Sequence, residues 1–308
     1  MPAVTLSEEI VDAINAVNGV HPGFRAVHAK GTVCEGTFTA TPEAARLSRA
    51  AHLQGEEVRC TVRFSNASGN PKASDAHPLA SRGIGVKFHL PGGGATDMAA
   101  LPLPLFMVRN ADDFLGFTRA RTPDPETGRP DPDRMMAFVA DHPETAAAIQ
   151  LGLPKLAPTT SYATSGYNGL HAFGLVAADG GETWGRYSWV PVEGEHYLSD
   201  PEREAAGRDY LQHEIRERLE GDGEARLRLD FKLAADGDSL TDPTEEWQGE
   251  REIVTLGELT VTGVIEEPAD GPLVFDPNNL TDGILASADP VLAARSPAYS
   301  VSVERRLA

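Results

Sequence analysis

The sequence predicts an α+β fold in which an antiparallel β-barrel is flanked by helices. Alternating apolar and polar residues mark strands both early and late in the chain, over 58–64, 84–90 and 227–233. Segments of helical periodicity precede these strands and lie between them, without the regular strand–helix alternation of a parallel sheet. Many separated antiparallel strands favour a sheet that is closed or curved into a barrel with helices packed outside it.

The first part of the chain is expected to contain two helices and a hairpin. A helix is predicted over 7–18, where apolar residues share one face and Thr5 and Glu8 fit a capping box. A second, short helix follows Thr41, whose hydroxyl suits an N-cap. The glycines at 92–94 predict the turn after the strand that ends near residue 90.

The second part of the chain alternates between helices and strands at longer intervals. Helices are expected at 110–121, 132–151 and 201–220. The middle one should break near Pro143, and a further strand is expected over 259–264. Neither the proline-rich 122–132 nor the segment 234–249 is long enough to require a domain boundary, so residues 1–308 are predicted to form a single domain.

Composition excludes several classes of function. The 308 residues include 46 Asp and Glu but only 27 Lys and Arg, for a net charge of −19, and no basic stripe for nucleic acid is present. No apolar run is long enough for a membrane span, and the start lacks the features of a signal peptide. Cys34 and Cys60 are expected to be buried thiols. These features predict a cytoplasmic protein.

Seven segments, in order along the chain, resemble motifs of the haem catalases. They are FRAVHAKG at 24–31, VRFS at 62–65, RGIGVKF at 82–88, LFMVRNA at 105–111, GYNGLHAF at 166–173, FDPNNL at 275–280 and RSPAY at 295–299. The overall size is similar to that of the small catalase-related peroxidases, which keep the barrel and lack the long N-terminal arm and C-terminal helical region of full catalases. The resemblance implies a catalase-like haem-binding core, with haem b as the cofactor.

The resemblance implies roles for four residues around the iron. Tyr299 would be the axial iron ligand, and Arg295, one helical turn earlier, would stabilise its phenolate. His28 would be the distal acid–base residue, since one imidazole can take a proton from one peroxide oxygen and give it to the other. Ser65 matches a position whose hydroxyl can orient that histidine, although a simple structural hydrogen bond is an equal alternative.

Four more residues are implied to hold the cofactor. Arg25, Arg63 and Arg306 match the arginines that bind the haem propionates in the family, and guanidinium suits carboxylate geometry. Phe114 matches an aromatic residue that packs on the porphyrin, while a core position on its helix is the competing interpretation.

One position departs from the pattern of full catalases. Those enzymes have an Asn that hydrogen-bonds the peroxide, and an ungapped alignment back from Phe106 places Leu101 there. Because Leu donates no hydrogen bond, the distal pocket should be more apolar. We therefore expect weak catalase activity and a better fit to organic hydroperoxides.

The implied function is a haem peroxidase that reduces a peroxide or organic hydroperoxide with a small organic reductant. Two alternatives stay open: a haem-dependent isomerase or dehydratase of fatty-acid hydroperoxides, and a haem-binding sensor or carrier without turnover. A peroxidase consumes an added electron donor, whereas an isomerase or dehydratase does not. Peroxide reactivity that depends on His28 distinguishes an enzyme from a sensor or carrier. Small relatives suggest a homodimer.

Overall fold

A curled antiparallel sheet forms the centre of the protein. The computed structural model describes residues 3–267 and 271–308. Its strands are β1 (Gly31–Ala40), β2 (Val58–Asn66), β3 (Arg82–His89), β4 (Ala95–Ala100), β5 (Tyr167–Asn168), β6 (Phe173–Val176), β7 (Glu182–Pro191), β8 (Ala225–Leu233), β9 (Ile253–Val264) and β10 (Ile284–Ala286). They follow the order β10-β6-β7-β8-β9-β1-β2-β3-β4, and β5 pairs with β7. The predicted antiparallel strands at 58–64, 84–90, 227–233 and 259–264 are confirmed.

A single bridge closes the curled sheet into a ring at one end. Directly after β4, the Leu101 amide donates to the Asn168 carbonyl at 3.0 Å, and the Asn168 amide donates to the Leu101 carbonyl at 2.6 Å. Asn168 belongs to β5, which pairs with β7. The path from β4 through this bridge to β7 and back through β8, β9 and β1 makes the predicted antiparallel barrel.

Eight α-helices and one short 3-10 helix, η1 (Ala51–Leu53), are present in the described part of the chain. The α-helices are α1 (Leu6–Asn18), α2 (Pro42–Leu47), α3 (Ala111–Ala120), α4 (Pro132–Asp141), α5 (Pro143–Leu156), α6 (Asp200–Ala205), α7 (Tyr210–Arg218) and α8 (Pro290–Leu307). The capping box between Thr5 and Glu8 and the break at Pro143 are confirmed.

The expected helix over 201–220 is wrong in its continuity. The chain forms α6 and α7, and between them Ala206 adopts an extended conformation. Ser199 is the N-cap of α6, in a capping box with Glu202, so Asp200 already lies inside the helix. Helix α6 therefore begins at Asp200, one residue before the predicted start at 201. The extended Ala206 ends it early.

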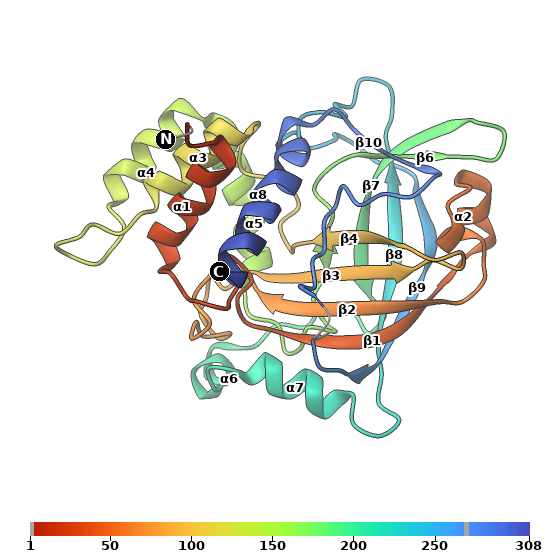
Figure 1. Ribbon diagram of the computed structural model, residues 1–308, viewed down its shortest axis with the longest axis horizontal. Coiled ribbons are helices and arrows are strands. Elements are labelled where there is room, and N and C mark those ends of the chain that lie inside the picture. The colour runs from red at the N-terminus through yellow and green to blue at the C-terminus, as the bar shows by residue number, and fades with distance from the viewer. Residues whose placement is uncertain (1–2, 268–270) are drawn as a thin grey trace.

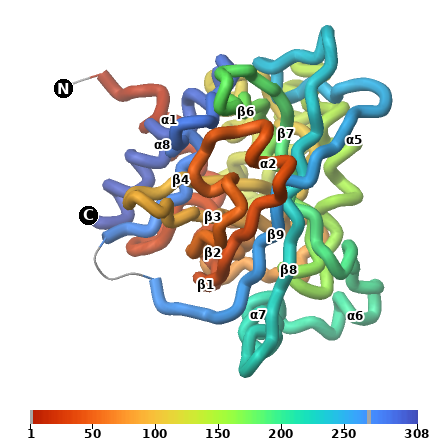
Figure 2. Tube along the Cα trace, turned by 90° about the vertical axis from the view of Figure 1, so that its right-hand side faces the viewer, coloured from red at the N-terminus to blue at the C-terminus, as the bar shows by residue number. Residues whose placement is uncertain are grey.

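The helices gather in separate places around the barrel. Figure 1 shows α1, α3, α4, α5 and α8 together beside one end of the barrel, with α6 and α7 along another side and α2 at the far end. Figure 2 shows α1 and α8 side by side in the perpendicular view, in agreement with their direct packing. The long helix α8 therefore lies between the strands β2–β4 and the outer helices.

Aromatic side chains fill the barrel interior. Phe38 meets Phe88 and Trp189 edge-on at ring-centroid distances of 5.2 and 6.1 Å, and His52 packs against Phe88. Cys34 and Cys60 are buried free thiols, as predicted, and burial raises the pKa of Cys34 to about 12. These side chains make the barrel a packed core rather than a channel.

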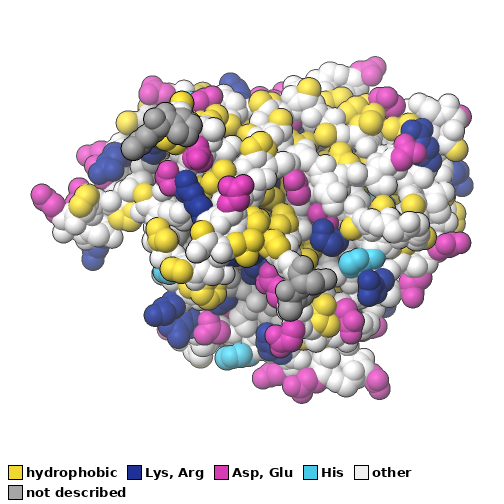
Figure 3. Space-filling model, in the orientation of Figure 1, with side chains coloured by type: hydrophobic (Ala, Val, Ile, Leu, Met, Phe, Trp, Pro, Cys, Tyr) yellow, Lys and Arg dark blue, Asp and Glu magenta, His cyan; other side chains and the backbone are white. Residues whose placement is uncertain are grey.

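The outer surface carries the acidic charge. On the face drawn in Figure 3, Asp and Glu side chains are spread over the surface, and Lys and Arg side chains lie singly or in small groups among them. Among the described residues, no helix is both long and apolar enough to cross a membrane.

Candidate active site

A pocket lies between the sheet and helix α8. It spans about 810 Å³, part of which opens to solvent. One wall comes from β2, β3 and β4, the other from α8, and the segments 25–28 and 273–275 complete it.

One face of α8 forms the helix wall. Arg295, Tyr299, Ser302 and Arg306 recur at spacings of three and four residues, so their side chains point the same way into the pocket. The helix begins at Asp289, whose carboxylate accepts from the backbone amides of Val291 and Leu292. The N-cap thereby fixes the rotation of the helix and the direction of this face.

A chain of hydrogen bonds runs from the start of α8 to the phenol of Tyr299. Asp289 Oδ2 lies 2.6 Å from His171 Nδ1, and His171 Nε2 lies 3.2 Å from Arg295 Nη1. Arg295 then donates to Tyr299 Oη from Nε at 3.1 Å and from Nη2 at 2.5 Å. Both bonds come from the one Arg295 guanidinium, so a permanent positive charge lies directly against the phenol oxygen.

Burial and nearby charges have opposite effects on the pKa values of the residues in this series of hydrogen bonds. Burial on its own lowers the pKa of Arg295, but the charge and hydrogen bonding of Tyr299 outweigh it and leave the pKa raised. Burial also lowers the pKa of His171 despite its bond to Asp289. A neutral His171 can donate from Nδ1 to Asp289 and accept the Arg295 N–H at Nε2, so each contact has one donor and one acceptor.

His28 lies on the sheet wall in an unusual backbone conformation. Its φ is 56°, in the left-handed region that costs a non-glycine residue about 1–3 kcal/mol. The amide of His28 donates to the Ala67 carbonyl at 3.3 Å, and Arg63 donates to the His28 carbonyl at 2.9 Å. Strain of this kind, held by contacts on both sides, is typical of functional positions.

The His28 ring is oriented by its neighbours. Its Nδ1 lies 2.9 Å from Ser65 Oγ, and the Ser65 hydroxyl can donate onward to the Gly83 carbonyl at 3.4 Å. A Cβ on Gly83 would lie 2.6 Å from His28 Cε1, so only glycine fits beneath the ring. With Nδ1–H donating to Ser65, the other nitrogen, Nε2, keeps a free lone pair toward the pocket.

His28 is held neutral. Burial lowers its pKa to about 3, and the positive charges of Arg63, Arg295 and Arg25 add to the effect. The imidazole therefore can accept a proton across the whole neutral and mildly acidic range.

Three arginines gather at the pocket beside a single described carboxylate. Arg25 donates to both oxygens of Glu267, at 2.7 and 3.3 Å, and Arg306 Nη1 lies 3.8 Å from the same carboxylate. Arg63 is buried and donates only to backbone carbonyls, at His28 and Ala29. Burial and the nearby charge of Arg25 lower the pKa of Arg63 to about 9.

This arrangement suits a dianionic ligand. Three guanidiniums face one carboxylate among the described residues, which leaves two uncompensated positive charges. Haem carries two propionates, and its iron would meet the phenol oxygen of Tyr299 on the helix wall. The Glu267 carboxylate already shows that Arg25 and Arg306 can share an anion. The donor set of the pocket therefore fits haem.

Seven of the eight predicted site residues line this pocket: Arg25, His28, Arg63, Ser65, Arg295, Tyr299 and Arg306. Phe114 does not. Its ring packs on Phe106, with the centroids 5.6 Å apart, and against helix α1. Phe114 thus lies at the interface of α3 with α1, and its packing on a porphyrin stays a prediction.

Leu101 lines the pocket, as the alignment predicted. Its neighbours there include Ala99, Ala100 and Ile84, so the sheet wall around it is apolar. Sequence reasoning did not find Glu267 or the link from His171 to Asp289. The only signal for Asp289 was its place before Pro290, which is typical of an N-cap.

Comparison with known proteins gives a consistent result. The family model described as catalase matches residues 9–308. The chain is 42% identical over 301 residues to the catalase-related peroxidase of Mycolicibacterium paratuberculosis, covering 97% of this chain and 94% of the relative. It is 37% identical over 303 residues to the catalase-related peroxidase of Synechococcus elongatus, covering 97% and 88%.

Larger catalases match in fold as well. Catalase-2 of Bacillus subtilis is 27% identical over 296 residues, which cover 90% of this chain but 43% of that protein. A crystal structure of a fungal catalase superposes with a TM-score of 0.82 at 22% identity. The match covers 97% of this chain and 62% of the fungal one, so the chain shares its core fold with a part of that longer protein.

Proposed function

The chain belongs to the catalase family, and we propose that this oxidoreductase acting on peroxide is a haem b-dependent peroxidase with weak catalase activity. Its oxidant would be an organic hydroperoxide or hydrogen peroxide, and its reductant a small organic donor. The observation that carries the proposal is Leu101, which puts an alkyl side chain in the pocket that also holds His28.

The proposed cofactor contacts follow from the two walls of the pocket. Tyr299 would ligate the iron through its phenolate, with Arg295 stabilising the negative charge. Arg25, Arg63 and Arg306 would bind the propionates. When bound, haem supplies an iron centre that can give up two electrons to a peroxide and regain them from a donor.

His28 would move the proton of the peroxide. Its bare Nε2 accepts the proton from one peroxide oxygen and returns it to the other as the O–O bond breaks, so that water or an alcohol leaves. Ser65 holds Nδ1 and thereby keeps the lone pair on Nε2. The reducing donor supplies two electrons and the remaining protons, which balances the reduction of ROOH to ROH and water.

Leu101 weakens the competing catalase reaction. Disproportionation requires a second hydrogen peroxide to be held and oriented while it gives up two electrons. A side chain without a donor or acceptor offers no hydrogen bond for that purpose, whereas an alkyl wall accommodates the organic part of a larger hydroperoxide.

Product analysis tests this proposal. The haem-loaded protein is mixed with cumene hydroperoxide, with and without a phenolic donor. We expect one equivalent of cumyl alcohol per two electrons taken from the donor, little oxygen release from hydrogen peroxide, and loss of turnover in His28→Ala with haem retained. Isomerised product without donor consumption would instead favour an isomerase, and unchanged peroxide reactivity in His28→Ala would overturn the role of that residue.

A further inference from the structure

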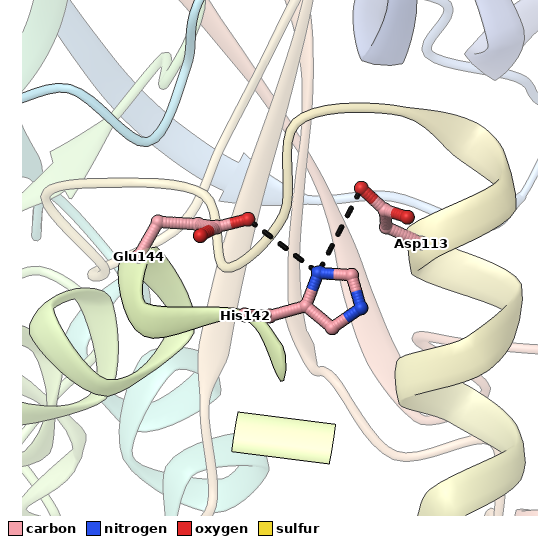
Figure 4. Close-up of side chains that lie close together, drawn as sticks. All are labelled: Asp113, His142 and Glu144. Carbon is pink, nitrogen blue, oxygen red and sulfur yellow. Dashed lines mark ion pairs between the residues drawn. The ribbon is translucent and has the colours of Figure 1, made fainter. Parts of the chain in front are cut away.

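Three potential metal ligands converge outside the pocket, where the start of α3 meets the turn between α4 and α5. Asp113 comes from α3, His142 from the turn and Glu144 from the first turn of α5 (Figure 4). His142 Nδ1 lies 3.9 Å from Asp113 Oδ2 and 3.6 Å from Glu144 Oε1, and one ligand atom from each residue lies within 4.8 Å of the others. Neither His142 distance is short enough for a hydrogen bond.

The Glu144 carboxylate keeps a little contact with solvent and receives no hydrogen bond from the described residues. Its side chain is only 8% exposed, and no described residue donates to it within hydrogen-bond distance. The nearest permanent cation is Arg109, whose Nη1 is 4.0 Å away and whose Nε is engaged by Asp242 at 3.0 Å. A carboxylate with so little solvent contact is stabilised by a cation or a hydrogen-bond donor close to it.

The other two ligands are already oriented toward the same point. The His142 ring stacks on Phe138 with centroids 4.1 Å apart and an interplanar angle of 18°, so its Nδ1 faces both carboxylates. Asn110 Nδ2 donates to Asp113 Oδ2 at 2.7 Å and fixes that carboxylate. Supporting contacts of this type are typical around metal ligands.

We propose that Asp113, His142 and Glu144 bind one divalent cation of the zinc type. Imidazole nitrogen and carboxylate oxygens bind Zn²⁺ at about 2.0–2.2 Å, which separates neighbouring tetrahedral ligands by about 3.4 Å. The observed 3.6 and 3.9 Å from the imidazole are a few tenths of an ångström wider, and the two carboxylate oxygens lie within 4.8 Å of each other, so side-chain rotation would bring all three onto one ion. Water would complete the coordination.

Such an ion would link helix α3 to the start of helix α5. Asp113 lies in the first turn of α3, and the other two ligands begin α5. The hydroxyl of the next residue, Thr145, already donates to the Met107 carbonyl at 2.7 Å and links α5 to the segment before α3. The ion would compensate the Glu144 charge and hold α5 against the segment that leads into α3.

Titration with zinc alone tests the site in the haem-loaded, chelator-treated protein. Isothermal calorimetry should find one tight Zn²⁺ per chain, with an affinity at least tenfold lower in Glu144→Gln, Asp113→Asn and His142→Ala. His213→Ala, which removes an exposed histidine on α7, is the control and should bind as the parent does.

Thermal unfolding provides the second readout. Zinc should raise the Tm of the parent protein and of His213→Ala but not that of Glu144→Gln, and the haem absorption band verifies that each variant is folded. Zinc binding of equal affinity in all four variants would contradict the proposal, because it would come from other surface groups. The absence of a tight site in the parent protein would contradict the proposal as well.

Discussion

Leu101 and Asn168 exchange two backbone hydrogen bonds, and this bridge closes the barrel beside the pocket. The position that the ungapped alignment matches to the peroxide-binding Asn of full catalases is therefore fixed by its backbone, while its side chain is free to vary. This separation makes residue 101 a place where the chemistry of the pocket can change without a change in the fold.

Leu101→Asn should raise catalase activity. The new amide could hydrogen-bond a peroxide next to His28, and a bond worth about 1.4 kcal/mol in the transition state corresponds to about tenfold in rate. Oxygen release from hydrogen peroxide, measured with an oxygen electrode, should increase by about that factor. Leu101→Met is the matched control and should leave the rate low, whereas equal rates in both variants would contradict the role given to this position.

Gly83→Ala should disable His28 without removing the cofactor. The added Cβ would lie 2.6 Å from His28 Cε1 and push the imidazole away from its position, and a displacement of about 1 Å can cost about 100-fold in rate. Stopped-flow mixing with peroxide measures the loss. Gly92→Ala, in an open turn with no atom within 4 Å of its Cβ, should react like the parent. A normal rate in Gly83→Ala would show that the ring position is not critical.

The reaction with peroxide should be insensitive to pH where an ordinary histidine would titrate. The pKa of His28 is lowered to about 3, so the imidazole stays neutral while the same residue in an unfolded chain protonates near 6.5. The second-order rate constant should be flat from about pH 8 to pH 5. A decline centred near pH 6.5 would contradict the assignment. The same shift favours folding above pH 6.5, and that contribution is lost as the pH falls toward 3.

Glu267→Gln should strengthen haem binding. Glu267 holds Arg25 and lies near Arg306, so its carboxylate competes with a propionate for the same donors. For a partly exposed pair the effect is about 1 kcal/mol, or about fivefold in the Kd for haemin. Titration followed by absorbance measures it. The neighbouring exposed Glu266→Gln is the control, and weaker binding in Glu267→Gln would show that this carboxylate supports the cofactor instead.

The sequence predicted local structure well and long-range pairing only in part. Periodicity located β2, β3, β8 and the second half of β9, and capping signals located α1 and α2, because both depend on neighbours along the chain. No ranges were predicted for the strands β1, β4 and β7. The split between α6 and α7 was missed because it depends on one extended residue. Short or flanking strands such as β5, β6 and β10 were missed because they are held by their pairing partners and not by their own pattern.

The same distinction between local sequence patterns and long-range contacts applies to the pocket. Motif positions identified seven lining residues, since six lie in the quoted motifs and Arg306 follows the last motif on the same helix. The contact of Arg25 with Glu267 spans 242 residues, and that of His171 with Asp289 spans 118, so no local pattern could reveal either one. Phe114 had the right local motif, but the packing of α3 on α1 decided its surroundings.

The absorption spectrum during haemin titration tests the central claim most directly. The parent protein should bind one haem per chain and show the bands of a ferric, high-spin, tyrosinate-ligated haem, because Arg295 donates to the Tyr299 oxygen and would stabilise it as an anionic ligand. In Tyr299→Phe those bands should disappear while the fold is retained. A parent protein that takes up no haem, or a Tyr299→Phe variant with an unchanged spectrum, would contradict the account.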